Sequence, residues 1–180
     1  MSGIFENYTG ARVLEFFIFN PTTEFHIKDL ARRLKISSST SKYYCDLFNK
    51  EGILKVVNKG NLRLFSLDSN DFLAKHLKKT FALLKIKELG LERASKEGSV
   101  AVYGSFASGE FDENSDLDVL IIGKEEEVEK DFILKIGQKL GREIQLTVLP
   151  YYKWEKMKQK KEVFVLEVLK NHVLLKGEGL

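Results

Sequence analysis

Apolar residues in the first third of the chain recur at helical spacing, with short polar breaks between them. An apolar-rich run at 11–20 predicts a helix, and apolar positions three or four apart at 27–34 and 44–48 predict two more. Three serines at 37–39 predict a turn and a helix cap between the last two. Two β-rich runs around a polar turn at 53–67 predict a hairpin. The expected order is three helices followed by a hairpin.

The remainder of the chain has a different pattern. Residues 71–97 have the apolar spacing of one long helix, in which Gly90 would mark a break. After this helix, β-branched runs alternate with helical segments, which is typical of a small sheet with helices packed on it. The expected elements are strands at 99–103, 117–122 and 143–149, a helix at 126–141, and a helix with a short last strand at 162–177.

These patterns predict an α+β fold in two parts. A first domain at 1–70 would hold the three helices and the β-hairpin, and a small mixed-sheet α/β domain would occupy 99–180. Residues 71–98 would form the helix that connects them. The apolar fraction of 43% and the charged fraction of 31% are those of a soluble globular chain.

Charge and cysteine content narrow the class of protein. The net charge of +3 is modest, so affinity for nucleic acid would have to come from how the charges are placed. The single cysteine, Cys45, excludes an internal disulfide and favours a reducing compartment. The N-terminus has no signal-peptide pattern, and no apolar run is long enough to span a bilayer. We therefore expect a cytoplasmic protein with no membrane partner.

The run LARRLKISSSTSKYYCDLFNKEGIL, with the predicted elements around it, resembles the winged helix-turn-helix family over about residues 8–68. The resemblance implies a DNA partner, and basic residues outnumber acidic ones eight to two between positions 32 and 63. The residues expected to contact DNA lie on the second helix of the motif and on the hairpin: Ser38, Ser39, Lys42, Tyr43, Lys59 and Arg63. The alternative is a protein-docking or dimerising scaffold, because basic residues on a solvated helix are common.

The stretch GSFASGEFDENSDLDVLII at 104–122 places glycine, serine and carboxylate residues between two predicted strands. Gly104 would let the chain turn sharply, so that free backbone N–H groups and the Ser105 hydroxyl could hold a phosphate. Asp116 and Asp118 are two apart on a strand, so both carboxylates point from one face and could hold Mg²⁺. The simpler interpretation is an acidic loop that caps a strand.

Gly-Ser at 104–105 and Ser-Asp-Leu-Asp at 115–118 together resemble the signature of the nucleotidyltransferases related to DNA polymerase β, and most of all their minimal, single-sheet branch. The resemblance covers about residues 80–178. It implies that a nucleoside monophosphate passes from an NTP to a hydroxyl group of a protein or nucleic acid. The residues it assigns are Gly104, Ser105 and Ser115 to the NTP, and Asp116 and Asp118 to Mg²⁺. Some members of this branch are antitoxins that modify a partner toxin, which implies a protein partner.

The chain departs from the family pattern at two points. The family has a third carboxylate on the strand after the helix, where Gln145 stands here. A neutral amide cannot act as a general base or as an anionic ligand, so Glu143, two residues earlier, is the candidate third catalytic residue. Minimal members also carry an arginine in the Gly-Ser loop, where Phe106 and Ser108 stand, and Arg142 is the candidate replacement for its phosphate contact.

Three functions are therefore open. The first is an Mg²⁺-dependent nucleotidyltransferase that also binds DNA. The second is a transcriptional regulator whose nucleotidyltransferase-like domain is inactive and only senses a nucleotide or mediates association. The third is a protein–protein adaptor that uses both folds as scaffolds. The long helix at 71–97 would also allow a homodimer.

Overall fold

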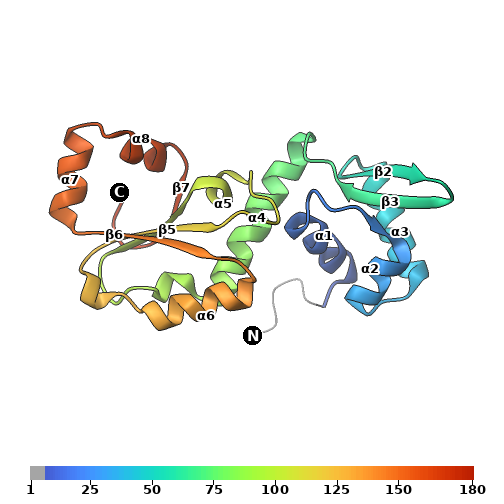
Figure 1. Ribbon diagram of the computed structural model, residues 1–180, viewed down its shortest axis with the longest axis horizontal. Coiled ribbons are helices and arrows are strands. Elements are labelled where there is room, and N and C mark those ends of the chain that lie inside the picture. The colour runs from blue at the N-terminus through green and yellow to red at the C-terminus, as the bar shows by residue number, and fades with distance from the viewer. Residues whose placement is uncertain (1–6) are drawn as a thin grey trace. The chain divides into compact units, whose positions relative to one another are not determined.

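The computed structural model describes residues 7–180, which divide into two compact units (Figure 1). The first unit ends at Phe81 and the second begins at Ala82, so the boundary lies inside helix α4 (Phe72–Leu89). Each unit combines helices with its own sheet. The mixed α+β fold predicted from the sequence is therefore confirmed.

The first unit contains three complete helices, the start of α4 and a three-stranded sheet. Its elements before α4 are α1 (Thr9–Phe19), β1 (Phe25–His26), α2 (Ile27–Leu34), α3 (Ser38–Lys50), β2 (Leu54–Lys59) and β3 (Leu62–Leu67). The strands pair antiparallel in the order β1-β3-β2, and β2 and β3 form a hairpin. Strand β1 was not expected, because two residues are too few to show an alternating pattern.

The turn between α2 and α3 is closed by local hydrogen bonding. Lys35 ends α2 in a left-handed conformation, with φ of 53°. The hydroxyl of Ser37 then accepts the N–H of Thr40 at 3.0 Å and caps the start of α3. Because of these two residues, only three positions, 35–37, separate the end of α2 from the start of α3.

Apolar side chains from every helix and from the sheet meet in the core of the first unit. Val13, Phe17, Leu30, Cys45 and Phe65 are each at most 1% exposed. Burial raises the pKa of the Cys45 thiol to about 12, so the thiol is neutral and belongs to the core. This core fixes which face of α3 is left for solvent.

The second unit is built on a four-stranded sheet. Its elements after α4 are η1 (Leu91–Arg93), β4 (Ser99–Tyr103), α5 (Gly104–Ser108), β5 (Leu117–Ile122), η2 (Glu125–Glu127), α6 (Lys130–Leu140), β6 (Ile144–Leu149), α7 (Tyr151–Gln159), α8 (Val163–Lys170) and β7 (His172–Lys176). The strand order is β6-β5-β4-β7. Strand β5 runs parallel to β6, and the other two pairs are antiparallel.

Strand β5 lies at the centre of the second unit. Leu117, Val119 and Ile121 on one face and Leu120 on the other are all fully buried. Leu120 packs against Trp154 and the buried face of α8, whereas Figure 1 shows α6 on the other side of the sheet. A strand covered on both faces is held rigidly, so residues at its start have a fixed position.

Two helices are shorter than the sequence pattern predicted. The helix expected at 126–141 is the shorter α6, because the backbone of Val128 forms a bridge with Ser95 before it. The helix expected at 71–97 is α4, which ends before Gly90 because that residue has φ of 73°. Among the described residues, none of the helices combines the length and the apolar character needed to cross a bilayer.

Candidate functional site

Strand β4 ends in a sharp turn beside an acidic side chain. Gly104 follows the strand with φ of 66°, in the left-handed region. A Cβ atom at this position would lie far inside van der Waals contact of the Asp118 carboxylate. The backbone of Gly104 therefore lies directly against Asp118, and both the turn and the contact favour glycine.

Asp116 and Asp118 form a carboxylate pair at the start of β5. Burial raises the pKa of Asp118, and the neighbouring charge of Asp116 raises it further. Both side chains are partly exposed, although the strand that follows them is buried. The two carboxylates are close enough to repel each other, and a bound cation would relieve that repulsion.

The parallel pairing of β5 and β6 brings Gln145 to this carboxylate pair. Gln145 is the register partner of Asp118, and its Nε2 donates a hydrogen bond to Oδ2 of Asp116 at 2.8 Å. An amide group is neutral, so this bond orients Asp116 without cancelling its charge. Where the family pattern has a third carboxylate, this chain has an amide that is bound to one of the other two.

Glu143 lies one residue before β6. Its backbone carbonyl accepts the N–H of Leu117 at 2.9 Å, and its side chain is exposed. Across residues 7–180, no group of three or more His, Cys, Asp or Glu side chains lies close enough together to hold a metal ion. The structure therefore brings Asp116 and Asp118 together but does not join Glu143 to them as a third carboxylate.

Arg142 fastens the loop between α5 and β5. Its guanidinium donates hydrogen bonds to the backbone carbonyls of Asp112 and Ser115, the second at 2.8 Å. It also lies over the rings of Phe106 and Phe111, which stack on each other with centroids 4.3 Å apart. Arg142, the predicted phosphate contact, thus holds this loop through its guanidinium.

Ser115 is hydrogen-bonded within the same loop. Its hydroxyl donates to Oδ1 of Asp112 at 3.0 Å and accepts the Asp112 N–H at 2.8 Å. The N–H of Asn114 and the Ser115 hydroxyl together lower the pKa of Asp112. Ser115 thus shapes the loop, while Ser105, partly exposed in α5, is the serine next to Gly104.

Tyr103 and Thr147 flank the carboxylate pair, and neither was predicted from the sequence. Their hydroxyl groups are 3.3 Å apart, and the Tyr103 ring meets Phe164 edge to face. Burial raises the pKa of Tyr103, and the charge of Asp118 adds to the effect, so the phenol stays neutral. The sequence positions of both residues indicate that they lie near the site. Tyr103 directly precedes Gly104, and Thr147 lies two residues after Gln145, so it is on the same face of β6.

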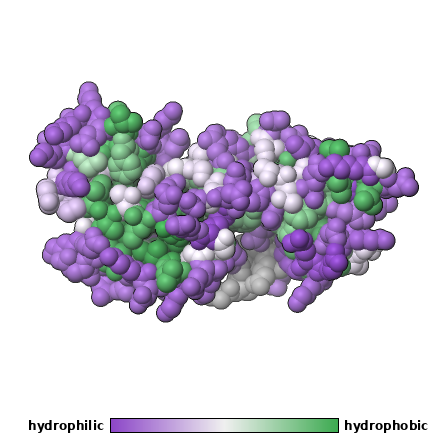
Figure 2. Space-filling model, viewed as in Figure 1, coloured by the Kyte–Doolittle hydropathy of each residue, from purple (hydrophilic) through white to green (hydrophobic). Residues whose placement is uncertain are grey.

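In the first unit, the expected DNA-contacting residues of α3 lie on its solvent face. Ser38, Ser39, Lys42 and Tyr43 are all exposed, Tyr43 by 62%. Figure 2 shows hydrophilic side chains over much of the visible surface of this unit. These four residues are exposed because the opposite side of α3, which carries Cys45, is buried in the core.

The two expected contacts on the hairpin are different, because both are in ion pairs. Lys59 lies 2.7 Å from Glu24, and Arg63 lies 2.8 Å from Asp46 of α3. Arg63 also covers the ring of Phe65. The pair with Glu24 joins residues 35 positions apart, so sequence spacing gave no sign of it.

The chain is similar to a known protein over about half of its own length. A provisionally assigned protein adenylyltransferase of Methanocaldococcus jannaschii is 30% identical over 89 residues, which are 48% of this chain and 61% of that protein. The chain therefore matches less than two thirds of that relative's length.

Two solved structures have weak similarity. A toxin–antitoxin structure with AMP-PNP is 19% identical, with 52% of this chain and 72% of the other covered and a TM-score of 0.35. Human N-acetylserotonin methyltransferase with SAM is 14% identical, with 48% and 32% covered and a TM-score of 0.29. Both scores are too low to support an argument about function.

The family assignment rests on a longer match. Residues 83–173, about half of the chain and all within the second unit, match the profile of the nucleotidyltransferase domain. The matched segment contains the Gly104 turn, the carboxylate pair and Gln145. The chain therefore belongs to the nucleotidyltransferase domain family.

Proposed function

We propose that this protein is an Mg²⁺-dependent nucleotidyltransferase that moves a nucleoside monophosphate from an NTP to a hydroxyl group of a protein or nucleic acid, with pyrophosphate as the leaving group. The observation that carries the proposal is the pair Asp116 and Asp118, of which Asp118 lies against the backbone of Gly104. In phosphoryl transfer, the protein mainly positions the phosphates and stabilises the charge that develops on them. Two carboxylates next to a glycine turn fit that task.

Asp116 and Asp118 suit one Mg²⁺ ion. Mg²⁺ is usually held by one or two carboxylates and completes its octahedral shell with water and substrate phosphate oxygens. When bound, it would offset the charge of those phosphates. A carboxylate has two oxygens, so the bond from Gln145 to Oδ2 of Asp116 is compatible with a cation at Oδ1.

The NTP and the acceptor need further groups from the chain. We propose that Gly104 and Ser105 bind the phosphates, because they form the turn that faces Asp118. We propose that Ser115 maintains the conformation of the loop beside them. The acceptor hydroxyl must lose a proton, which Gln145 cannot accept. Glu143 is the carboxylate at the adjacent register position, and as general base its exposed side chain would turn toward Asp116.

Transfer of label from α-³²P NTPs tests this proposal. The full chain is incubated with each NTP, Mg²⁺, and acceptors that include proteins co-purified with it, tRNA and the chain itself. Asp116→Asn and Asp118→Asn should each abolish transfer, whereas Asp131→Asn, at an exposed site in the first turn of α6, should leave it unchanged. Equal transfer by all three variants and the parent would contradict the proposal.

The similarity to the M. jannaschii protein favours ATP as the donor and a protein as the acceptor. A small partner protein, such as a toxin that is silenced by the modification, fits this acceptor class. Mass spectrometry of proteins purified with the chain would show the expected added adenylyl group on a Tyr, Ser or Thr. If only nucleic acid is labelled, a protein acceptor is ruled out and the transferase proposal stands.

We also propose that the first unit is a winged helix-turn-helix that binds DNA through α3, with the β2–β3 hairpin as the wing. The supporting observations are the capped turn between α2 and α3 and the exposed Ser38, Ser39, Lys42 and Tyr43. Such a helix would place these side chains in a major groove. The wing cations would exchange their carboxylate partners for DNA phosphates.

Fluorescence anisotropy with labelled duplexes over a salt series tests DNA binding. Affinity should fall steeply with salt, because each phosphate contact releases condensed counterions. Lys42→Ala should weaken binding, and Lys135→Ala, at an exposed position of α6, should not. Binding that is absent at low salt, or is insensitive to Lys42→Ala, would count against the DNA proposal without affecting the transferase.

Gln145 favours a second candidate function. Because the third carboxylate is replaced by an amide, the site could bind a nucleotide without transferring it. The chain would then be a regulator in which the nucleotide changes DNA affinity or association. Phe72 at the start of α4 is 80% exposed, which would suit a homodimer. DNA affinity and molar mass measured with and without a non-hydrolysable NTP, for the parent and for Phe72→Glu, distinguish this function.

A further inference from the structure

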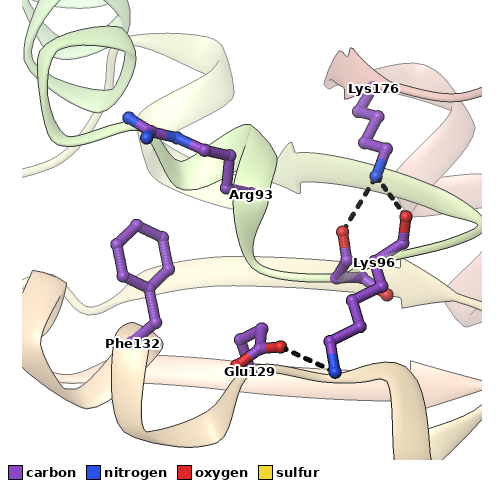
Figure 3. Close-up of a pocket in the computed structure, with 6 residues that line it drawn as sticks. Arg93, Lys96, Glu129, Phe132 and Lys176 are labelled. Carbon is purple, nitrogen blue, oxygen red and sulfur yellow. Dashed lines mark hydrogen bonds and ion pairs between the residues drawn. The ribbon is translucent and has the colours of Figure 1, made fainter.

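The second unit contains a pocket that is separate from the carboxylate pair. It has a volume of about 460 Å³ and is lined by Arg93, Ser95, Lys96, Glu129, Phe132 and Lys176 (Figure 3). These residues come from η1, the segment before β4, the start of α6 and the end of β7. Cavities of 300–1,000 Å³ are the usual size for small-molecule sites.

The pocket and the carboxylate pair lie at opposite ends of strand β4. At the end nearer the carboxylates, Tyr103 pairs with His172 of β7, and at the other end Val100 pairs with Lys176. The strand has five residues, so its first and last residues are roughly 13 Å apart. A ligand in the pocket therefore does not share the residues proposed for transfer.

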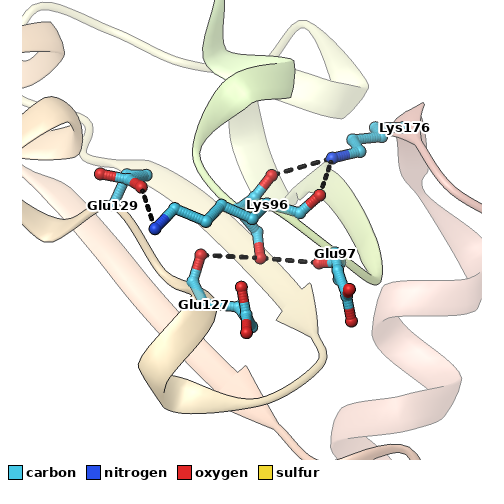
Figure 4. Close-up of polar contacts among 6 residues, drawn as sticks. Lys96, Glu97, Glu127, Glu129 and Lys176 are labelled. Atoms are coloured by element: carbon cyan, nitrogen blue, oxygen red, sulfur yellow. Dashed lines mark hydrogen bonds and ion pairs between the residues drawn. The ribbon is translucent and has the colours of Figure 1, made fainter.

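One side of the pocket is built from backbone that is already paired. The segment around Ser95 forms a bridge with Val128, and the N–H of Lys96 donates to the carbonyl of Glu127 at 3.0 Å. The buried Ser95 hydroxyl donates to the carbonyl of Glu97, a residue labelled in Figure 4, at 2.7 Å. The site therefore exists before any ligand binds, which keeps the entropic cost of binding low.

Three cationic side chains line the pocket, against one carboxylate. Lys96 is 3.3 Å from Glu129 and its side chain is 65% exposed. Lys176 donates to the carbonyls of Ser95 and Lys96 at 2.9 and 2.7 Å, which leaves one of its three N–H groups for another acceptor. The Arg93 guanidinium packs on the backbone of Gly90, where any Cβ would clash with it, and the side chain is 65% exposed.

The charge of this pocket is suited to an anion. Glu92 lies 3.7 Å from Nε of Arg93, at the edge of its guanidinium, so other N–H groups of that fork remain for a second partner. The Phe132 ring extends from α6 in the same pocket and offers an apolar face (Figure 3). A planar ring and a phosphate group would therefore both find a complementary surface.

We propose that this pocket binds a nucleoside monophosphate, with its phosphate at Arg93, Lys96 and Lys176 and its base against Phe132. The inference does not rest on the proposed transfer reaction. It assigns a second ligand site to the family domain, at the end of β4 away from the carboxylates.

Isothermal titration calorimetry on the full-length Asp116→Asn/Asp118→Asn variant tests this site while the carboxylate pair is disabled. The probes are AMP, GMP and CMP, with inorganic phosphate, ribose 5-phosphate and adenosine for comparison. At least one nucleoside monophosphate should bind saturably, and more tightly than inorganic phosphate or adenosine. The affinity should fall as ionic strength rises, because partly exposed ion pairs are screened.

Variants of the lining residues then locate the binding. Arg93→Ala and Lys96→Ala, both exposed, should each weaken binding about tenfold, as expected for loss of a hydrogen bond to a charged group. Phe132→Leu should weaken binding of the nucleotide and leave that of inorganic phosphate unchanged. Lys139→Ala, on an exposed part of α6, is the matched control and should have no effect.

Three outcomes would overturn the proposal. The first is no saturable binding of any probe at millimolar concentration. The second is equal affinity in the parent and the Arg93→Ala/Lys96→Ala double variant. The third is binding that the parent shows and the Asp116→Asn/Asp118→Asn variant lacks, because the nucleotide would then occupy the carboxylate site. The first two outcomes leave the proposed transfer untouched.

Discussion

The two units differ in how their candidate functional residues are held. On α3 of the first unit, Lys42 and Tyr43 project into solvent. In the second unit, Asp118 touches the Gly104 backbone and Asp116 is hydrogen-bonded to Gln145. A surface that binds a long polyanion tolerates mobile side chains, whereas a group that transfers phosphate must be held within a fraction of an ångström.

This difference predicts different sensitivity to mutation. Each residue of an exposed binding surface adds a small, nearly independent amount to affinity. Residues that share hydrogen bonds around one reacting centre act as a unit, so the loss of one can remove most of the activity. The four predictions below test that contrast, from the largest expected effect to the smallest.

Gly104→Ala should reduce nucleotidyl transfer by at least about a hundredfold, since a Cβ would displace Asp118 and a small misplacement costs about that much. It should also lower the free energy of unfolding, because the left-handed conformation costs a non-glycine residue about 1–2 kcal/mol. Gly141→Ala is the control, since it has φ of 69° and nothing within 4 Å. Equal activity of the two variants would mean that Gly104 is not part of the site.

Arg142→Met should lower the free energy of unfolding by about 2–3 kcal/mol, as expected when a charged donor leaves partly buried carbonyls without their partner. The methionine keeps apolar contact with Phe106 and Phe111, so the loss reports the hydrogen bonds. Urea unfolding measures it, with Lys139→Met on the exposed part of α6 as the control. A change below 0.5 kcal/mol, on the scale of a surface substitution, would mean that Arg142 does not fasten the loop.

Gln145→Glu should lower the free energy of unfolding of the metal-free protein by about 1 kcal/mol, because a third carboxylate would meet Asp116 in place of an amide N–H. Added Mg²⁺ should restore the loss and raise the melting temperature more than it does for the parent. Gln138→Glu, exposed on α6, should show neither effect. If Mg²⁺ stabilises the parent and Gln145→Glu equally, the side chain does not face the cation site.

Lys42→Ala should weaken DNA binding about fivefold and reduce the salt slope by about one. Arg63→Ala should have a smaller effect, because Arg63 must first leave Asp46 to reach a phosphate. Anisotropy at several salt concentrations measures both slopes. A larger effect at Arg63 than at Lys42 would mean that the hairpin, and not α3, makes the main contact with DNA. It would also show that ion pairing does not reduce the contribution of a wing cation.

The sequence predicted the parts of the fold that depend on local spacing. The two-residue spacing of Asp116 and Asp118, next to a glycine at a strand end, identified the candidate site without any structure. The helices and hairpin of the first unit followed from apolar periodicity and the serine cap. Such features need only a few neighbouring residues, so they can be read from the sequence.

Contacts between distant segments could not be predicted in the same way. The bond from Gln145 to Asp116 depends on the register of two parallel strands. The pairing of Lys59 with Glu24 depends on where the hairpin tip lies relative to β1. The missing first turn of α6 has the same cause, because Val128 is taken up by a bridge to another segment. In each case tertiary pairing overrides the local pattern.

The contacts of Arg142 with the loop between α5 and β5 have a consequence for the rate at which a nucleotide associates with the site. Two carbonyl hydrogen bonds and a pair of stacked rings, all made within the protein, order the loop beside Asp116. A nucleotide that arrives meets a surface that is already formed, so its association should not wait for a slow rearrangement of that loop. On that basis, stopped-flow association would be a single phase linear in nucleotide concentration, and selectivity among nucleotides would appear in their dissociation rates.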